Sequence, residues 1–547
     1  MKNKKLLTPV LLLFIILVAS FLRLYQLGMV PSSPDWDEAA LGYNAYSILQ
    51  TGRDEYGKFM PIVLRSFDDY KPALYMYFIA PLIPLFGVDI ISVRLPSAIL
   101  GILTVLASYF LIKELFKKKD IALLTSFLLA ISPMSIQFSR VAFETNTGVA
   151  FNVFGAYFFL KGLKKPIFLI LSALFFGLNL SVYQSDRVFT PLLALAFIAI
   201  LWKQVFAIPK KYLIGALLVG IITILPLAIN ITTNTKSLYR FKGVSIFSEP
   251  TTLKNETQKR YIDDKNNGNI TGVLFHNRWV AYSREIMSGY LSHFDLNWLF
   301  IRGDLARHHA PSMALLYLWE LPFLLIGIYS LIFNKFTTKT KLLIFAWFLL
   351  APVPAAVTNG VPHSVRTLNF LPTFQIFVAL GIINSFLFFN KYKSFGIRYL
   401  IFSGVGLFAA FNFVYYLNQY FVQQNYFTSQ EWQYGYKETV SYVQEINSKY
   451  KKIVVSDRAP FDQSHMFFLF YLKYPPELYQ MAGNASGGFL ESHKFDKYEF
   501  RPIDWANEER SSDILYIGRP QDFERGGNIL KTINYLDGKP AIVIVEG

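Results

Sequence analysis

Three acidic side chains follow the first apolar run of the chain and could act on a substrate. Asp35, Asp37 and Glu38 lie within residues 34–40, directly after a run that begins near Leu6. A carboxylate at the edge of a membrane span can accept a proton as a general base or bind a cation. An acid in this position can also cap a helix or lie in a solvated loop. With Trp36 beside the acids, a catalytic or cation-binding role and a role as helix cap or solvated loop are equally supported.

Two basic residues are candidates for an anionic group such as a phosphate. Lys71 precedes a short apolar run, and Arg94 lies at the start of the next long one. An interfacial lysine often reaches a lipid phosphate instead of a bound substrate. Arg94 lies at an end of its span that otherwise carries few bases, which favours a specific anionic partner.

Further polar groups lie at the ends of later apolar runs. Glu144 begins one of these runs, and ionisable groups at such a depth are costly and tend to be functional. Residues 183–187 include Tyr183 and Arg187, and residues 362–366 include His363 and Arg366. Capping of a helix is the structural alternative for the last two segments.

Histidines gather in residues 231–312, where His308 and His309 are adjacent. Histidine and carboxylate are suitable zinc ligands, but two adjacent histidines do not form a metal motif by themselves. The chain has no cysteine, so thiolate metal sites, disulfides and a cysteine nucleophile are excluded. The sequence points to no certain cofactor and leaves a divalent cation open.

The elements that carry these residues are predicted to be membrane-spanning helices. Apolar residues make up 53% of the 547 residues and charged residues only 16%, which is untypical of a soluble protein. Apolar runs of roughly the length needed to cross a bilayer recur as far as Phe421. The predicted spans, about eleven in number, cover residues 6–27, 94–115, 121–138, 147–162, 166–183, 188–203, 212–230, 313–333, 341–357, 367–388 and 399–420.

Lysines in alternate loops predict the orientation of these spans. Lysine-rich loops such as 113–119 and 161–165 are expected to be cytoplasmic. The N-terminus is then cytoplasmic, and loops 28–93, 139–146, 231–312 and 358–366 are extracytoplasmic. This topology places all candidate site residues on one side of a multi-pass plasma-membrane protein. The net charge of +16 is concentrated in the cytoplasmic loops, so nothing indicates nucleic-acid binding.

The sequence predicts two domains. Residues 1–421 form the polytopic α-helical membrane domain, and residues 422–547 form a small extracytoplasmic α/β domain, with strands near 453–455, 514–517 and 541–545. The apolar run 73–88 is expected to lie in the outer interface, because another span there would invert the lysine pattern. Short interfacial helices are also expected in the loop 231–312.

The order of these features resembles that of a known family. An Asp-Glu pair after the first span, a Lys-Pro-x-Leu-Tyr stretch, an Arg-Leu-Pro-Ser entry to the next span, an outer acid and a Pro-His-x-x-Arg loop follow in sequence. The chain in this respect resembles the C-type (GT-C) membrane glycosyltransferases, within the protein O-mannosyltransferase and aminoarabinose transferase-like group. The likeness covers about residues 1–420. One departure is Lys71-Pro72-Ala73, where Lys-Pro-Pro is common.

The resemblance implies a reaction and a role for each candidate. A sugar would pass, with inversion, from a polyprenyl-phosphate donor to a hydroxyl of a protein, lipid or glycan acceptor. Asp37 would be the catalytic base, with Glu38 and Glu144 in the same cavity. The phosphate would meet Lys71, Arg94, Arg187 and Arg366, while Asp35, Tyr183 and His363 would line the substrate cavity.

A flippase or transporter for polyprenol-linked sugars is the principal alternative. Transporters place ionisable residues near the middle of the bilayer, whereas the predicted spans have few charges at their centres. The polar groups crowd one face, which favours an enzyme. Neither the sugar, the acceptor, the task of the C-terminal domain nor the oligomeric state follows from the sequence.

Overall fold

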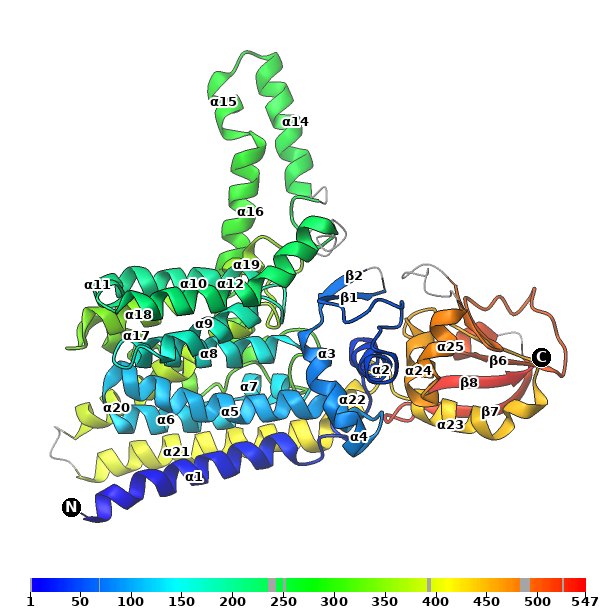
Figure 1. Cartoon of the computed structure of the whole chain (residues 1–547), viewed down its shortest axis with the longest axis horizontal. Coiled ribbons are helices and arrows are strands. Elements are labelled where there is room, and N and C mark those ends of the chain that lie inside the picture. Colours follow the sequence, from blue (N-terminus) through cyan, green and yellow to red (C-terminus); the bar gives the residue numbers. More distant parts are fainter. Residues whose placement is uncertain are drawn as a thin grey trace.

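The computed structural model describes residues 2–67, 69–234, 243–248, 252–390, 395–482, 492–523 and 526–547. Long helices lie side by side in a bundle, with the N-terminus at one end and the C-terminal domain at the other (Figure 1). The bundle helices are α1 (Lys2–Leu24), α5 (Ile90–Phe116), α6 (Lys119–Ile131), α7 (Pro133–Ser139), α8 (Thr145–Gly162), α9 (Phe168–Asn179), α10 (Asp186–Ile200), α12 (Lys210–Thr233), α17 (Glu320–Phe333), α18 (Thr338–Leu350), α20 (Thr373–Phe389) and α21 (Phe395–Asn418).

Each predicted span contains at least one of these helices. By length and apolar composition, six helices of the described chain can cross a membrane, or seven if a bent pair is one span. Helix α8 does not meet this test because it carries polar residues such as Asn146 and Asn152, which are buried against other helices. A helix in the middle of a bundle has little contact with lipid and therefore needs fewer apolar side chains. The count of eleven spans stays a prediction.

The bent pair is α6 and α7, which meet at 58°. Pro133 is the first residue of α7, and the Ser132 side chain caps that helix by accepting from the backbone N–H of Ser135. Proline is favoured at this first position because its missing N–H would have no partner there. The bend leads the chain into the segment 139–144, which contributes Glu144 to one end of the bundle.

The first predicted outer loop folds into short elements at the end of the bundle next to the C-terminal domain. Asp35 caps the first of these helices by accepting from the N–H of Glu38 at 2.9 Å. Helix α3 runs across the direction of the bundle (Figure 1). The elements are α2 (Trp36–Thr51), β1 (Val63–Ser66), β2 (Asp69–Pro72), α3 (Leu74–Ile79), η1 (Ala80–Leu82) and α4 (Ile83–Phe86).

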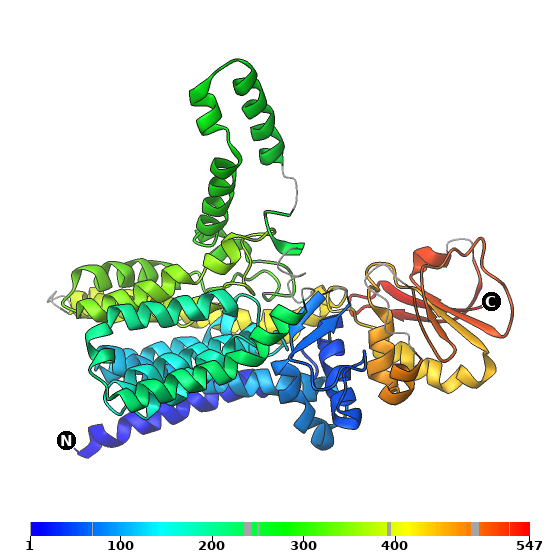
Figure 2. The same cartoon turned by 45° about the horizontal axis from the view of Figure 1, so that its top comes forward.

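The second long loop contains an arm that projects from the side of the bundle in both views (Figure 2). Its helices are α14 (Thr252–Asn266), α15 (Ile270–Phe275) and α16 (Arg278–Ser292), followed by the short π-helix η3 (Trp298–Arg302). Large apolar side chains of the arm are exposed, among them Phe275, Trp279 and Met287. Their exposure suits the predicted interfacial placement, which stays a prediction.

The remaining short helices connect these parts. They are α11 (Trp202–Phe206), α19 (Val353–Ala356), η4 (Leu368–Phe370), η5 (Gln419–Gln423) and α22 (Gln424–Thr428).

The C-terminal domain is an α/β unit, as its strand pattern predicts. Its six strands have the order β4-β5-β3-β6-β8-β7, and the central pairs β5-β3 and β3-β6 are parallel. The sequence pattern found three of these strands and missed the shorter or more exposed ones. The elements are α23 (Tyr436–Ile446), η6 (Asn447–Lys449), β3 (Lys452–Val455), α24 (Ser464–Leu472), α25 (Pro476–Met481), β4 (His493–Phe495), β5 (Tyr498–Phe500), β6 (Ile514–Gly518), η7 (Pro520–Phe523), β7 (Asn528–Asn534) and β8 (Pro540–Glu546).

The first outer loop and the C-terminal domain share one hydrophobic core. Apolar residues of α2, α3 and the start of α5 belong to the same buried cluster as residues of α23, α24 and the sheet. Gly42 of α2 allows the closest approach, because a Cβ there would lie 2.5 Å from the ring of Phe470. The C-terminal domain therefore holds the helix that carries Asp37 and Glu38.

Candidate functional site

A polar cavity of about 150 Å³ lies at the end of the bundle near α2. Six chain segments far apart in the sequence contribute to its wall. The lining residues are Asp35, Asp37, Lys71, Pro72, Phe143, Glu144, Tyr183, Gln184, Leu305, Arg307, His308, His363, Val365 and Arg366. Seven of the ten site residues predicted from the sequence are in this wall.

Asp37 and Lys71 form an ion pair in the cavity. Asp37 lies in the first turn of α2, where the backbone N–H groups favour a negative charge. About a third of its side chain is exposed, whereas Lys71 is almost buried. Burial alone would lower the pKa of Lys71, but the neighbouring Asp37 and Glu144 raise it above its usual value. The lysine therefore remains a cation that faces two carboxylates.

Asp35 lies in the cavity wall and is held there on both sides. Its Oδ2 accepts from Arg307 at 2.7 Å, and its Oδ1 caps α2. Burial raises the pKa of Asp35 to about 6, although Arg307 acts against this shift. The guanidinium of Arg307 also lies over the ring of Trp36, with 5.2 Å to the centroid. This arrangement makes Asp35 a fixed part of the wall that positions Arg307.

Glu144 lies on the same cavity as Asp37, as the sequence predicts for an outer acid. Its side chain is buried, and burial raises its pKa to about 7 while Lys71 opposes the shift. Arg366 approaches the cavity from another loop and is anchored by hydrogen bonds to Thr358 Oγ1 and the Asn359 carbonyl, both at 2.6 Å. The cavity thus combines carboxylates with three half-buried or buried cations, Lys71, Arg307 and Arg366.

Glu38 and Arg94 occupy a different place from the one expected. They form a bidentate ion pair with N···O distances of 2.9 and 2.7 Å, and neither side chain is exposed. Arg94 also donates to the carbonyls of Pro31 and Ser33. Glu38 accepts in addition from the N–H of Ala142. The pair ties α2 to α5 behind the cavity, so its geometry differs from the expected phosphate contact of Arg94 and the expected cavity position of Glu38.

Arg187 is also absent from the residues that line the cavity. Its Nε donates to the Leu180 carbonyl at 3.2 Å, and another nitrogen donates to Gln184 Oε1 at 2.7 Å. Gln184 does line the cavity and donates to the Tyr70 carbonyl at 3.0 Å. Arg187 therefore orients a cavity residue instead of facing the cavity.

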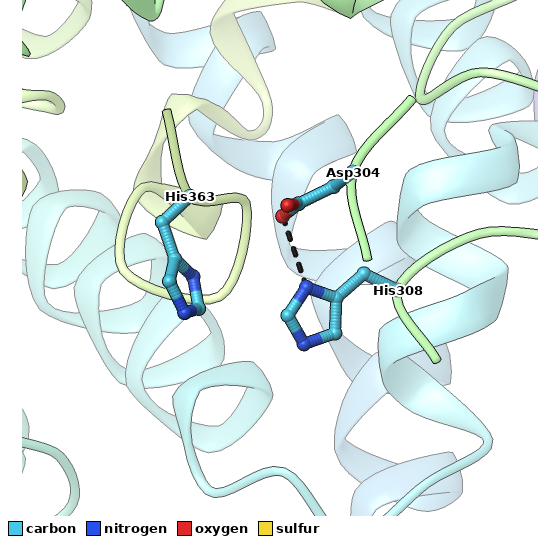
Figure 3. Close-up of side chains that lie close together, drawn as sticks. All are labelled: Asp304, His308 and His363. Atoms are coloured by element: carbon cyan, nitrogen blue, oxygen red, sulfur yellow. Dashed lines mark hydrogen bonds and ion pairs between the residues drawn. The ribbon is translucent and has the colours of Figure 1, made fainter. Parts of the chain in front are cut away.

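Asp304 lies close to two residues of the wall, His308 and His363, and the three form a cluster that the sequence did not assign (Figure 3). Asp304 Oδ2 lies 2.9 Å from His308 Nδ1, and the His308 and His363 rings are 5.2 Å apart. His309 turns away, with its Nε2 against the Asp304 carbonyl and its Nδ1 against that of Ala310. The four-residue spacing of Asp304 and His308 is the sequence signal that could have identified this cluster, whereas His309, adjacent to His308, does not lie within it.

The sequence matches one family model over residues 70–229, that of dolichyl-phosphate-mannose-protein mannosyltransferase. This segment includes Lys71, Arg94, Glu144 and Arg187 of the predicted site. No curated protein matches the chain.

Solved structures similar to this chain include ArnT and an archaeal oligosaccharyltransferase. The structure of ArnT from Cupriavidus metallidurans bound to undecaprenyl phosphate has a TM-score of 0.54 and 11% identity, and the match covers 100% of this chain and 98% of that one. The apo form of ArnT gives the same values. The oligosaccharyltransferase AglB from Archaeoglobus fulgidus has a TM-score of 0.48 and 11% identity, with 94% and 70% covered.

The family match and the shared fold agree with the order of motifs in the sequence. The ArnT likeness extends over nearly the whole of both chains, including the C-terminal domain, and it shows a common fold. The family match adds a sequence relation in the segment that carries four of the candidate residues. The chain therefore shares the fold of ArnT, and its residues 70–229 match the family model of dolichyl-phosphate-mannose-protein mannosyltransferase.

Proposed function

We propose that this protein transfers a sugar from a polyprenyl-phosphate donor to an acceptor hydroxyl, with inversion at the anomeric carbon. The observation that carries the proposal is the Asp37–Lys71 pair in a polar cavity next to the end of the bundle. The shared fold with ArnT, whose structure holds undecaprenyl phosphate, supports the class of donor.

Asp37 is the base in this reaction. The acceptor oxygen attacks the anomeric carbon, its proton passes to the Asp37 carboxylate, and the bond from the sugar to the phosphate oxygen breaks. The bonding electrons leave with the polyprenyl phosphate, so a single displacement inverts the anomeric carbon. Asp37 suits this task because it is more exposed than Asp35 or Glu144.

The cations of the cavity stabilise the leaving group. Negative charge grows on the phosphate as the bond breaks, and fixed cations in a site shielded from water stabilise that charge. Lys71 and Arg366 are the predicted phosphate residues that line the cavity. An entering phosphate competes with Asp37 for Lys71, which leaves the carboxylate available for the acceptor proton.

The active face is extracytoplasmic in this proposal. Helix α2, whose Asp37 lines the cavity, and the C-terminal domain lie at the same end of the bundle, opposite the N-terminus (Figure 1). The lysine-rich loops support a cytoplasmic position for the N-terminal end. The acceptor is a hydroxyl of a protein, lipid or glycan outside the cell.

Transfer assays with membranes test the proposal. Membranes containing the full chain are incubated with radiolabelled polyprenyl-phosphate sugars, and labelled products are separated into protein, lipid and glycan fractions. We expect a labelled product that depends on the donor. Membranes that scramble the labelled lipid between leaflets without any transfer would instead support a flippase.

A further inference from the structure

Three potential metal ligands meet at the wall of the cavity. One oxygen or nitrogen atom each from Asp304, His308 and His363 lies within 4.8 Å of the others. Figure 3 shows the Asp304 carboxylate directed toward the space between the two imidazole rings. The side chains of Asp304 and His308 are only 7% and 6% exposed, so the cluster is not a solvated surface group.

We propose that Asp304, His308 and His363 bind one divalent metal ion of the zinc class. Two imidazoles and one carboxylate are a typical zinc ligand set, and two nitrogen ligands disfavour magnesium and calcium, which prefer oxygen. A metal site with three protein ligands leaves a fourth position for water or substrate. His308 and His363 both line the cavity, so that fourth position faces it.

His363 supplies an observation that points to a ligand. Its Nδ1 is buried and has no hydrogen-bond partner among the described residues. A buried polar nitrogen without a partner is costly, and a metal ion would supply the missing partner.

The ligands are held by a second set of contacts. Asp304 Oδ2 accepts from both the N–H and the hydroxyl of Ser364, at 2.7 and 2.5 Å. The N–H of His363 donates to His293 Nε2 at 3.2 Å. Such contacts fix the orientation of metal ligands and are a regular part of metal sites in proteins. They connect the segment 303–309 to the loop that carries His363.

The ligand atoms of Asp304, His308 and His363 need to move only a short distance to bind a zinc ion. Zinc lies about 2.0–2.1 Å from its nitrogen and oxygen ligands, so tetrahedral ligand atoms are roughly 3.3 Å apart. Asp304 Oδ2 and His308 Nδ1 are already 2.9 Å apart. The metal replaces the proton between these two atoms, and His308 keeps its other proton on Nε2. With one carboxylate, the occupied site has a charge of +1, which favours an anionic fourth ligand such as a phosphate oxygen.

Metal binding by the purified full chain tests this site. The protein is stripped with a chelator, loaded with Zn²⁺ or Co²⁺, washed, and analysed for metal content, while Co²⁺ absorption reports the coordination. We expect one ion per chain and a Co²⁺ spectrum typical of four ligands. His363→Gln and His308→Gln should each weaken metal binding by more than about 100-fold. Loss of a residue that only supports a metal ligand typically costs about 10–100-fold. His309→Gln is the matched control, since this neighbouring histidine binds only backbone carbonyls.

Inorganic phosphate then tests the open position. Its addition should change the Co²⁺ spectrum of the wild-type protein. Loss of metal in His309→Gln but not in His363→Gln would overturn the ligand assignment, and so would a wild-type protein that binds no Zn²⁺ or Co²⁺. Circular dichroism of each variant separates loss of a ligand from loss of folding. The metal site does not depend on the proposed transfer, so a protein that binds the metal but transfers no sugar would overturn only the proposed function.

Discussion

Lys71 lies among acids that differ in how far they are exposed. Asp35 and Glu144 are 1% and 7% exposed, whereas about a third of the Asp37 side chain is accessible. Burial shifts the first two toward their protonated forms. Asp37, which is paired with Lys71, is therefore the carboxylate that an acceptor hydroxyl can reach.

We expect Asp37→Asn to lower the rate of transfer by about 10²–10⁴-fold, the usual contribution of a general base. The amide keeps nearly the same shape and can still form hydrogen bonds, but it does not accept the proton. Single-turnover assays with labelled donor measure the loss, and donor binding should persist. Near-normal turnover in Asp37→Asn, combined with inactive Glu144→Gln, would reassign the base to Glu144.

Asp35→Asn should affect stability more than chemistry. An asparagine can still cap α2, but it loses the ion pair with Arg307 in the cavity wall. Asp35→Ala removes the cap as well, which typically costs about 1 kcal/mol. Thermal unfolding in detergent measures both variants. A rate loss for Asp35→Asn as large as that of Asp37→Asn would contradict this division of roles.

Glu144 should make stability depend on pH. Burial raises its pKa from 4.5 to about 7. The nearby acids Asp37 and Asp35 add to this shift, and Lys71 opposes it. At pH values between 4.5 and about 7, Glu144 holds a proton in the folded protein and releases it in the unfolded chain. Stability contributed by this group is therefore lost as the pH rises from 4.5 to about 7. Melting temperatures across this range should depend less on pH in Glu144→Gln, and an unchanged slope would exclude Glu144 as the source.

Arg94 is predicted to act on folding. Arg94→Ala leaves the Glu38 carboxylate buried without its partner, which typically costs about 3–5 kcal/mol. Arg94→Lys should rescue little, because an ammonium group cannot reproduce the bidentate contact. Yield of folded protein and thermal unfolding report the effect. The double variant Arg94→Met with Glu38→Gln leaves no unpaired charge, so it should be more stable than Arg94→Ala.

Helix α2 depends on a close contact with the C-terminal domain. Its Tyr43 hydroxyl donates to the Tyr474 carbonyl at 3.1 Å, and the N–H of Trp36 donates to Gln433 Oε1 at the same distance. Gly42 lies where α2 meets Phe470 and Val93. Residues that are remote in sequence thus fix the helix that presents Asp37.

Gly42→Ala should disturb this contact. The new Cβ would lie 2.5 Å from the Phe470 ring and 2.8 Å from a Val93 methyl, and such overpacking typically costs about 1–3 kcal/mol. The loss should be smaller in a Phe470→Leu background. Thermal unfolding and transfer assays measure it. Gly404→Ala in α21 is the control, because no atom lies within 4 Å of the position of its Cβ.

The sequence predicted the helices and much of the cavity because both leave local signals. Apolar runs locate the bundle helices, and acids or bases at their ends locate Asp37, Lys71 and Glu144. It did not predict the Glu38–Arg94 pair, because a polar residue at a helix end looks the same whether it faces a cavity or another helix. Nor did it predict that Asp304 would meet His363, since that contact depends on the arrangement of distant loops.

For the whole molecule, the topology can be tested with single cysteines, since the chain has none. Lys118→Cys should resist an impermeant thiol reagent in intact cells, and Lys494→Cys, on the exposed surface of the C-terminal domain, should react. The reason is that the lysine-rich loop 113–119 is predicted to be cytoplasmic. Both cysteines should react after the membrane is permeabilised. Labelling at 118 in intact cells would invert the proposed location of the cavity.

The core shared by α2 and the C-terminal domain has a consequence for biosynthesis. Helix α2 ends at Thr51, and the helix that covers it, α24, begins only at Ser464. At about 5–20 residues per second, translation takes roughly 20–80 seconds to travel between them. During this interval the apolar face of α2 has no partner from the C-terminal domain, although its acids have already been made. A nascent chain therefore carries Asp37 without its finished surroundings, and we expect sugar transfer to begin only after release from the ribosome.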